Sequence, residues 1–147
     1  MLAALIGLLG CAGAAEGPRT AGASAPRGWI ELAIHDPSVP ADPVGDPGGG
    51  AARPPPCEVE LELNGVVALS ERLDPQGSAP PYTVDETLRV AAPAGSHDAA
   101  LYYSGCRTAW GQLDGRSAEV ALVVRAGYVT RLEFDGSTVL TWPPVPR

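Results

Sequence analysis

The stretch from Glu58 to Leu69, EVELELNGVVAL, decides the fold class of this 147-residue chain. Residues 58–63 alternate strictly between glutamate and an aliphatic side chain, the period-two pattern of a β-strand with one face in water. Asn64-Gly65 follows, and a second apolar run begins directly after it. Asn-Gly between two such runs signals a β-hairpin, because a type I′ turn needs positive φ at both central residues. The stretch therefore predicts a hairpin whose first strand buries Val59, Leu61 and Leu63.

Strand patterns and turn sequences recur along the rest of the chain. Further strands are predicted at residues 29–35, with Ile30, Leu32 and Ile34 inward, and at 86–91, 98–103, 118–124, 128–134 and 137–142. The turns between them include Pro93-Ala94-Gly95-Ser96, Arg125-Ala126-Gly127 and Asp135-Gly136. The 18 glycines and 16 prolines favour turns over helices. The sequence predicts an all-β protein, a small antiparallel β-sandwich of about seven to eight strands.

The N-terminal residues 1–11, MLAALIGLLGC, carry an apolar run that is too short to span a bilayer, which takes about 20 residues. The run has the length of a signal-peptide core. Its end, Leu8-Leu9-Gly10-Cys11, resembles the lipobox of bacterial lipoproteins. The resemblance implies a signal peptide at residues 1–10 that is cleaved before Cys11, and a lipid such as palmitate on the Cys11 thiol. The protein would then be anchored to a membrane of the bacterial cell envelope, with its soluble part outside the cytoplasm.

The flanks of this segment leave one alternative open and define the domain boundaries. No Lys or Arg precedes Cys11, although such signals normally begin with one, so a start upstream of Met1 stays open. The alternative for the whole segment is an ordinary apolar N-terminus with an incidental cysteine. Residues 11–27 are rich in Ala, Gly, Ser and Pro, a composition typical of a flexible tether. The β-sandwich domain is expected at residues 28–147.

A Pro/Gly-rich loop is expected within this domain at residues 36–56. Proline lacks the N–H that a strand ladder needs, so the loop is predicted to lack regular structure. Asp36, Asp42 and Asp46 lie in it and could in principle hold calcium. Their spacing does not match the D-x-D-x-D-G calcium loop, so we expect solvated carboxylates.

The cysteines favour one disulfide. With Cys11 lipidated, Cys57 and Cys106 remain, and an even pair outside the cytoplasm indicates a bridge. It would close a loop of about 50 residues, to which chain-entropy theory assigns about 4 kcal/mol. The alternative is a metal site. Zinc usually takes four ligands at close spacing, however, and the chain adds only His35 and His97.

The order of elements from about Cys57 to Asp135 resembles that of PEGA-type modules, small β-sandwich repeats of bacterial surface proteins and lipoproteins. The residues that carry the resemblance are Asn64-Gly65, Pro93-Ala94-Gly95, Leu101-Tyr102-Tyr103 and Ala126-Gly127. Pro93-Ala94-Gly95-Ser96 agrees with the tetrapeptide that names the family at Pro and Gly. The same turns also fit an Ig-like or transthyretin-like sandwich. The resemblance implies a non-catalytic module, so it assigns no catalytic residues.

The sequence carries no recognisable catalytic motif. It lacks a G-x-S-x-G elbow, and Gly48-Gly49-Gly50 is not followed by the Lys-Ser/Thr of a phosphate loop. Glu58, Glu60 and Glu62 could pair as in a glycosidase, but a row of like charges on an outer sheet face is more simply solvated. His35 and His97 could act as general bases. No nucleophile is marked beside them, and both are expected to be exposed.

Aromatic residues are the remaining candidates for binding. Tyr102 and Tyr103 are adjacent on a predicted strand, so one is expected in the core and the other outside. Trp110 follows Cys106 in a predicted loop, as either a contact residue or a lid on the end of the sandwich. The net charge of −7 argues against nucleic acid as a partner, since phosphate binding needs clustered basic residues.

The functional prediction is a non-enzymatic binding or scaffolding module held at the cell envelope by lipid on Cys11. No cofactor or metal is expected, and the partner beyond the membrane would be an envelope protein or a polysaccharide. The alternative is a small envelope hydrolase with an unrecognised site. A concave pocket with convergent polar groups would favour the enzyme, and a flat patch would favour partner binding.

Overall fold

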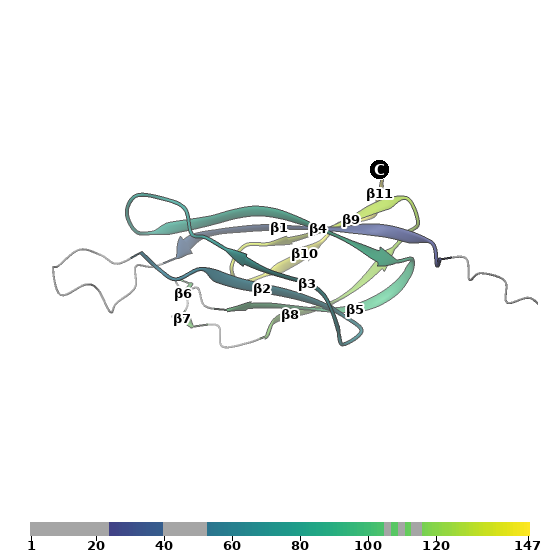
Figure 1. The fold of residues 1–147 in the computed structure, drawn as a ribbon, viewed down its shortest axis with the longest axis horizontal. Helices are drawn as coiled ribbons and strands as arrows, with labels where there is room; N and C mark the ends of the chain where they lie inside the picture. Colours follow the sequence, from purple (N-terminus) through teal and green to yellow (C-terminus); the bar gives the residue numbers. More distant parts are fainter. Residues whose placement is uncertain (1–23, 40–52, 105–106, 109–110, 113–115) are drawn as a thin grey trace, which may run out of the picture.

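The structure, a computed structural model, describes residues 24–39, 53–104, 107–108, 111–112 and 116–147. Within these ranges every helix or strand assigned is a β-strand. The strands form two main sheets, one five-stranded and one four-stranded, and a separate pair of very short strands. Figure 1 shows the two main sheets as stacked layers whose strands run along the long axis of the molecule. The predicted all-β sandwich is confirmed.

The five-stranded sheet joins the two chain ends of the domain. It contains β1 (Arg27–Val39), β4 (Tyr82–Pro93), β9 (Tyr128–Phe134), β10 (Val139–Thr141) and β11 (Val145–Pro146). The order is β10-β9-β1-β4, and β11 also pairs with β9. β1 and β9 are parallel, which departs from the predicted all-antiparallel arrangement. Most of the domain separates these two strands in sequence, so no tight turn constrains their relative direction.

The four-stranded sheet contains the hairpin that decides the fold class. Its order is β3 (Val66–Leu73), β2 (Cys57–Leu63), β5 (Gly95–Ser104) and β8 (Arg116–Val124), and all pairs are antiparallel. Asn64 and Gly65 have φ of 53° and 77°, so the predicted hairpin turn is confirmed. The separate short pair consists of β6 (Arg107–Thr108) and β7 (Gly111–Gln112).

The core lies between the two main sheets. The alternating residues predicted to point inward are buried: Ile30, Leu32 and Ile34 on β1, and Val59, Leu61 and Leu63 on β2. Tyr103 from β5 and Phe134 from β9 meet edge to face, with ring centroids 5.0 Å apart. Each such side chain contributes about 1.5–3 kcal/mol on burial, so these contacts between layers hold the sandwich together.

β1 extends through Asp36 to Val39, so the first four residues of the segment predicted to be an irregular loop belong to a strand. Asp36 pairs with Val84 and Val39 with Tyr82, and the register shifts between them. Pro37 lies in this irregularity, where its missing N–H costs no regular ladder bond. Asp36 continues the inward alternation of β1 and is fully buried, so the expectation that it is solvated was wrong. Asp42 and Asp46 lie outside the described residues.

One end of the sandwich gathers the beginning and the end of the described domain, and we call it the N-terminal end. It consists of Arg27 and the turns at 64–65, 94 and 125–127, together with Arg147. The backbone N–H of Gly127 donates to the Arg27 carbonyl at 3.1 Å, and that of Arg147 donates to the Gly127 carbonyl at 3.3 Å. Figure 1 shows this end on the right, where β11 and the marked C-terminus lie. The opposite end, called the distal end, contains Val39, Cys57 and Ser104.

Candidate functional site

The outer face of the four-stranded sheet is the candidate site. The alternation of β2 turns Val59, Leu61 and Leu63 into the core, so its three glutamates point away from the core. We call this surface the glutamate face. It comprises Glu58, Glu60 and Glu62 on β2, Ser70 and Arg72 on β3, Tyr102 on β5 and Glu119 on β8.

Tyr102 lies near the middle of the glutamate face. It is opposite Glu60 in the register between β2 and β5, and it is half-buried. Its neighbour Tyr103 is fully buried in the core. The prediction that these two tyrosines divide between the inside and the outside is confirmed. The result is one aromatic ring on an otherwise charged sheet surface.

Two hollows flank Tyr102 and share it as a lining residue. The first is about 710 Å³ and is also lined by Glu58, Glu60, Glu71, Ser70 and Arg72. The second is about 570 Å³, and its polar lining residues are Glu62, Asn64, Asp98 and Glu119. All of these residues belong to the four-stranded sheet or to its hairpin turn, so the hollows lie on one surface and are not a cleft between the two sheets.

The glutamates of β2 lack ionic partners among the described residues. Glu58, Glu60 and Glu62 take part in none of the ion pairs there. Alternate residues of a strand are about 7 Å apart, so these carboxylates repel one another along β2. Arg72, opposite Glu58 in the register, is the one described arginine that lines the two hollows. The face therefore has an excess of negative charge that a cation could compensate.

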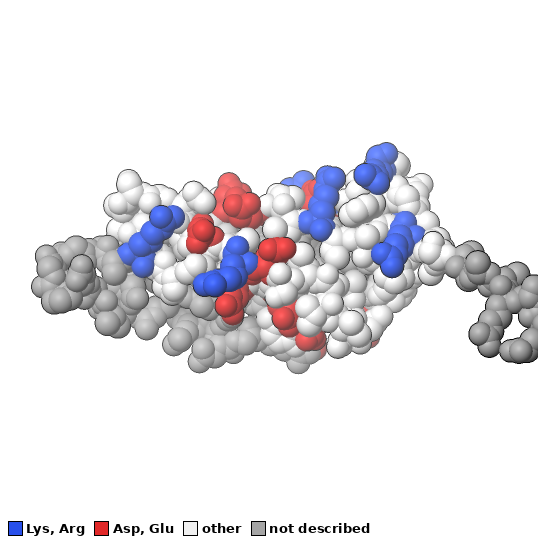
Figure 2. Space-filling view, in the orientation of Figure 1, with Lys and Arg blue, Asp and Glu red and all other residues white. Residues whose placement is uncertain are grey.

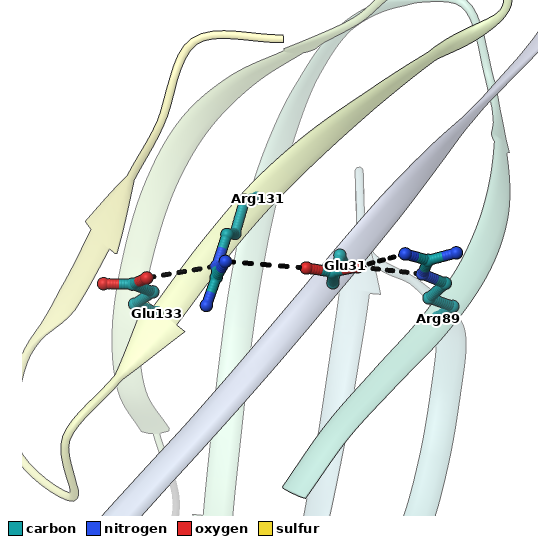
Figure 3. A network of polar contacts seen from close by, with 4 residues as sticks. All are labelled: Glu31, Arg89, Arg131 and Glu133. Carbon is teal, nitrogen blue, oxygen red and sulfur yellow. Dashed lines mark hydrogen bonds and ion pairs between the residues drawn. The ribbon is translucent and has the colours of Figure 1, made fainter. Parts of the chain in front are cut away.

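The outer face of the five-stranded sheet contrasts with this arrangement, because its charges pair with one another (Figure 3). The Nε and Nη2 of Arg89 both donate to Glu31 Oε2, at 2.8 and 2.6 Å. Arg131 lies 3.9 Å from Glu31 Oε1 through its Nη1, and 3.0 Å from Glu133 Oε1 through its Nε. Two glutamates and two arginines thus form a chain across β4, β1 and β9 that needs no external ion.

The two histidines lie apart from the glutamate face and from each other. His35 is exposed, as expected, and its Nδ1 is 3.8 Å from Asp85 Oδ1. His97 is half-buried, so the expectation that it is exposed was wrong. Its Nδ1 is 3.1 Å from Asn64 Nδ2 and its Nε2 is 2.8 Å from the Pro93 carbonyl. A neutral ring that donates from Nε2 and accepts at Nδ1 satisfies both contacts and ties the hairpin turn to the β4–β5 turn.

The remaining predicted residues are only partly described. Cys57 begins β2 and is fully buried. Cys11, Cys106 and Trp110 lie outside the described residues, so lipidation, the disulfide and the tryptophan contact stay predictions. In the described part of the chain no three His, Cys, Asp or Glu side chains group as metal ligands. No helix there has the length and apolar character needed to cross a membrane.

Comparison with known proteins gives no relative of this chain. No protein-family model, no curated protein and no solved structure matches it. Arguments about its function therefore rest on its own residues and their arrangement.

Proposed function

We propose that this protein is a lipid-anchored, non-enzymatic binding module of the bacterial cell envelope, and that its glutamate face holds a basic segment of another envelope protein. The observation that carries the proposal is the contrast between the two outer faces. The charges of Glu31, Arg89, Arg131 and Glu133 compensate one another, whereas Glu58, Glu60 and Glu62 have no ionic partner among the described residues.

The chemistry of the glutamate face fits a cationic partner. A basic side chain between neighbouring carboxylates would relieve their repulsion along β2. Tyr102 offers a ring on which an arginine or lysine can stack, a contact of about 0.5–1 kcal/mol at exposed sites. The two hollows extend on either side of this ring, which suits an extended peptide segment better than a small substrate. A polysaccharide, which would use the ring without the charges, is the alternative partner.

Two features of the sequence support the location and the non-enzymatic role. Leu8-Leu9-Gly10-Cys11 resembles a lipobox, which implies acylation of Cys11. The hairpin order resembles PEGA-type modules, which are not catalytic. Replacement of Cys11 by Ser should leave the signal segment uncleaved and the chain without lipid. Recovery of this variant in the membrane fraction with an acyl group elsewhere, or a wild-type protein that keeps residues 1–10 and is soluble, would contradict the anchor.

The proposal also includes a disulfide between Cys57 and Cys106. The register supports it, because Glu58 lies opposite Ser104 in the antiparallel pair of β2 and β5. β5 ends at Ser104, which precedes Cys106 by two residues in the sequence, beside the strand that Cys57 begins. A bridge needs Cα atoms within about 7 Å, so the proposal requires the chain after Ser104 to stay beside the start of β2.

The partner can be captured in cells with a photo-crosslinking residue. We would insert p-benzoylphenylalanine in place of Tyr102 and, as the matched control, in place of Thr87 on the outer face of the five-stranded sheet. A crosslinked envelope protein is expected at position 102 and not at position 87. The crosslink should be lost when Glu58, Glu60 and Glu62 are changed together to Gln, and it should persist in the Glu133→Gln control.

The same variants distinguish the two kinds of partner in solution. Binding of a lysine-rich peptide by the purified protein should fall at least tenfold in the triple glutamine variant and should weaken with salt, since exposed charges are screened. If peptidoglycan or polysaccharide fragments bind the wild type and the triple glutamine variant with equal strength, the partner is a glycan and not a protein. An equal crosslink yield at positions 102 and 87 would contradict the proposal that the partner binds the glutamate face.

A further inference from the structure

Three arginines meet at the N-terminal end of the sandwich. Arg27 opens β1, Arg125 lies in the β8–β9 turn, and Arg147 follows β11. The backbone of Gly127 hydrogen-bonds both the Arg27 carbonyl and the Arg147 N–H, so residues from both ends of the domain surround one turn. A Cβ on Gly28 would clash with the Arg125 carbonyl oxygen, which shows how closely β1 packs on this turn.

The charges of these arginines are available to a partner. None of the three forms an ion pair within the described part of the chain. Arg147 lies over the Trp29 ring, 5.1 Å from its centroid, and keeps its charge in that contact. Asp98 lies beside the hairpin turn, where its backbone N–H donates to Asn64 Oδ1. Figure 2 shows arginines at the right-hand end, whereas most acidic side chains in this view lie further along the molecule.

Exposed apolar side chains accompany the arginines. Val66 is 68% exposed and Val67 is 50% exposed, both directly after the hairpin turn at this end. Val145, at 56%, pairs with Val129 at the start of β9. A hollow of about 320 Å³ lies beside Val66 and Val67 and is closed by Ala91, Ala92 and Pro93 at the end of β4. The end thus combines unpaired cations with apolar surface.

The sequence ties this end to the anchor. Fifteen residues, 12–26, separate Cys11 from Arg27. Even when fully extended, a chain of this length cannot exceed ~55 Å. The N-terminal end would therefore be the part of the domain closest to the bilayer.

We propose that the N-terminal end docks on the anionic phospholipid surface of the membrane that holds the anchor, an inference that rests on the lipid anchor proposed above. Arg27, Arg125 and Arg147 contact lipid phosphates, and Val66, Val67 and Val145 lie at the headgroup boundary. The whole chain carries a net charge of −7 even with these three arginines counted, so the rest of it is repelled from the same surface. The strands then run roughly along the membrane normal, and the glutamate face is held sideways, open to a partner beside it.

The test uses the acylated full-length mature protein and its arginines as reporters. The protein is reconstituted on vesicles of phosphatidylcholine alone, or on vesicles that also contain phosphatidylglycerol, and is treated with phenylglyoxal. Mass spectrometry then gives the modification of each arginine. Phenylglyoxal should modify Arg27, Arg125 and Arg147 severalfold less on the vesicles that contain phosphatidylglycerol than on phosphatidylcholine. This protection should decrease as the salt concentration rises. Arg72 at the distal end is the internal control and should react equally on both.

A matched pair of variants tests whether the three arginines act together. An arginine near an anionic surface contributes about fivefold to binding. Arg125→Gln should therefore reduce the protection of Arg27 and Arg147 to near the level on phosphatidylcholine. Arg53→Gln, which changes an exposed arginine before the start of β2, should leave it unchanged. Uniform reactivity of Arg27, Arg125 and Arg147 on both vesicles, or equal protection of Arg72, overturns the docking surface.

The anchor and the docking surface can fail separately. Acyl lipid on Cys11, read from the mass of the N-terminal peptide, decides the anchor alone. An acylated protein without arginine protection keeps the anchor and overturns the docking surface. If Cys11 carries no lipid, the anchor fails, and the footprint of the unacylated chain on anionic vesicles decides whether this end recognises phospholipid.

Discussion

The phenol of Tyr103 on β5 donates a hydrogen bond to Asp36 Oδ2 on β1, at 3.3 Å, across the interior of the sandwich. Both residues are fully buried, and they belong to different sheets. The pair therefore adds a directional contact to an apolar interface, and it specifies which part of β1 faces which part of β5. The edge-to-face contact of Tyr103 with Phe134 fixes the orientation of the ring that carries the hydroxyl.

Removal of this hydroxyl should destabilise the fold without disturbing the surface. Tyr103→Phe deprives the buried Asp36 carboxylate of a donor, so we expect a loss of about 1–3 kcal/mol in the free energy of unfolding. Tyr102→Phe is the matched control, since it removes the same hydroxyl from the adjacent but outward-facing tyrosine, and it should change stability by less than about 0.5 kcal/mol. Urea unfolding followed by circular dichroism measures both. Equal effects of the two substitutions would contradict a stabilising contact at Tyr103.

The same tyrosine should make the fold sensitive to alkali. Burial raises the pKa of Tyr103 above its ordinary value of 10.0, and the negative charge of Asp36 and the hydrogen bond to it raise it further. At lower pH the phenol is protonated in both states, and its contribution to stability is complete. At higher pH the unfolded chain loses the proton while the folded protein keeps it, so the unfolded state gains and stability falls until the raised folded pKa is passed.

The size of this effect follows from linkage. Between about pH 9 and about pH 11 the wild type should lose about 1.4 kcal/mol more than Tyr103→Phe, which lacks the group. The other tyrosines titrate in both proteins and cancel in the comparison. Stability curves that stay parallel up to pH 11 would show that the folded pKa of Tyr103 is not raised.

Gly136 and Gly65 form a matched pair for testing the crowding above Asp36. Both have positive φ, at 90° and 77°. A Cβ on Gly65 would meet nothing within 4 Å, whereas one on Gly136 would lie 2.9 Å from Asp36 Cγ. Gly65→Ala should therefore cost only the backbone strain, about 1–2 kcal/mol. Gly136→Ala should cost a further 1–3 kcal/mol or so, because the buried carboxylate must move. Equal melting temperatures for the two variants would argue against this close approach.

The local sequence predicts the sheets better than it predicts their polar interior. The β2–β3 hairpin could be predicted because strict alternation and Asn64-Gly65 specify both the strand and its turn within a few residues. Asp36 was misassigned to a loop because Pro37 follows it, although the inward positions Ile30, Leu32 and Ile34 predict that the next inward residue is Asp36. One donor to the buried carboxylate is a tyrosine 67 residues away, and no local sequence pattern predicts such a partner.

The charged surfaces show the same limit. The row of glutamates on β2 could be recognised in the sequence. That these glutamates are unpaired, whereas the charges on the outer face of the five-stranded sheet pair with one another, could not. Arg89, Glu31 and Arg131 come together only because β1 pairs with both β4 and β9, and the second of these pairings is the unexpected parallel one. Arg27 and Arg147 likewise meet because β11 returns to the start of β9 beside β1.

The disulfide proposed between Cys57 and Cys106 should stabilise the domain against heat and denaturant. It would tie the start of β2 to the chain that follows β5, at the distal end of the four-stranded sheet. A closed loop of about 50 residues is worth about 4 kcal/mol in chain-entropy theory, so reduction should lower the melting temperature by well over 10 °C in a domain of this size. The wild type should show this shift, and the double variant Cys57→Ser, Cys106→Ser should not respond to reductant.

Thiol counting provides the independent measurement for this bridge. The mature, acylated protein should show no titratable thiol when denatured without reductant, and two after reduction. A peptide map of the non-reduced protein should contain residues 57 and 106 in one linked fragment. Two thiols in the native exported protein would disprove the bridge, and they would return Cys57 and Cys106 to the alternative of metal ligands.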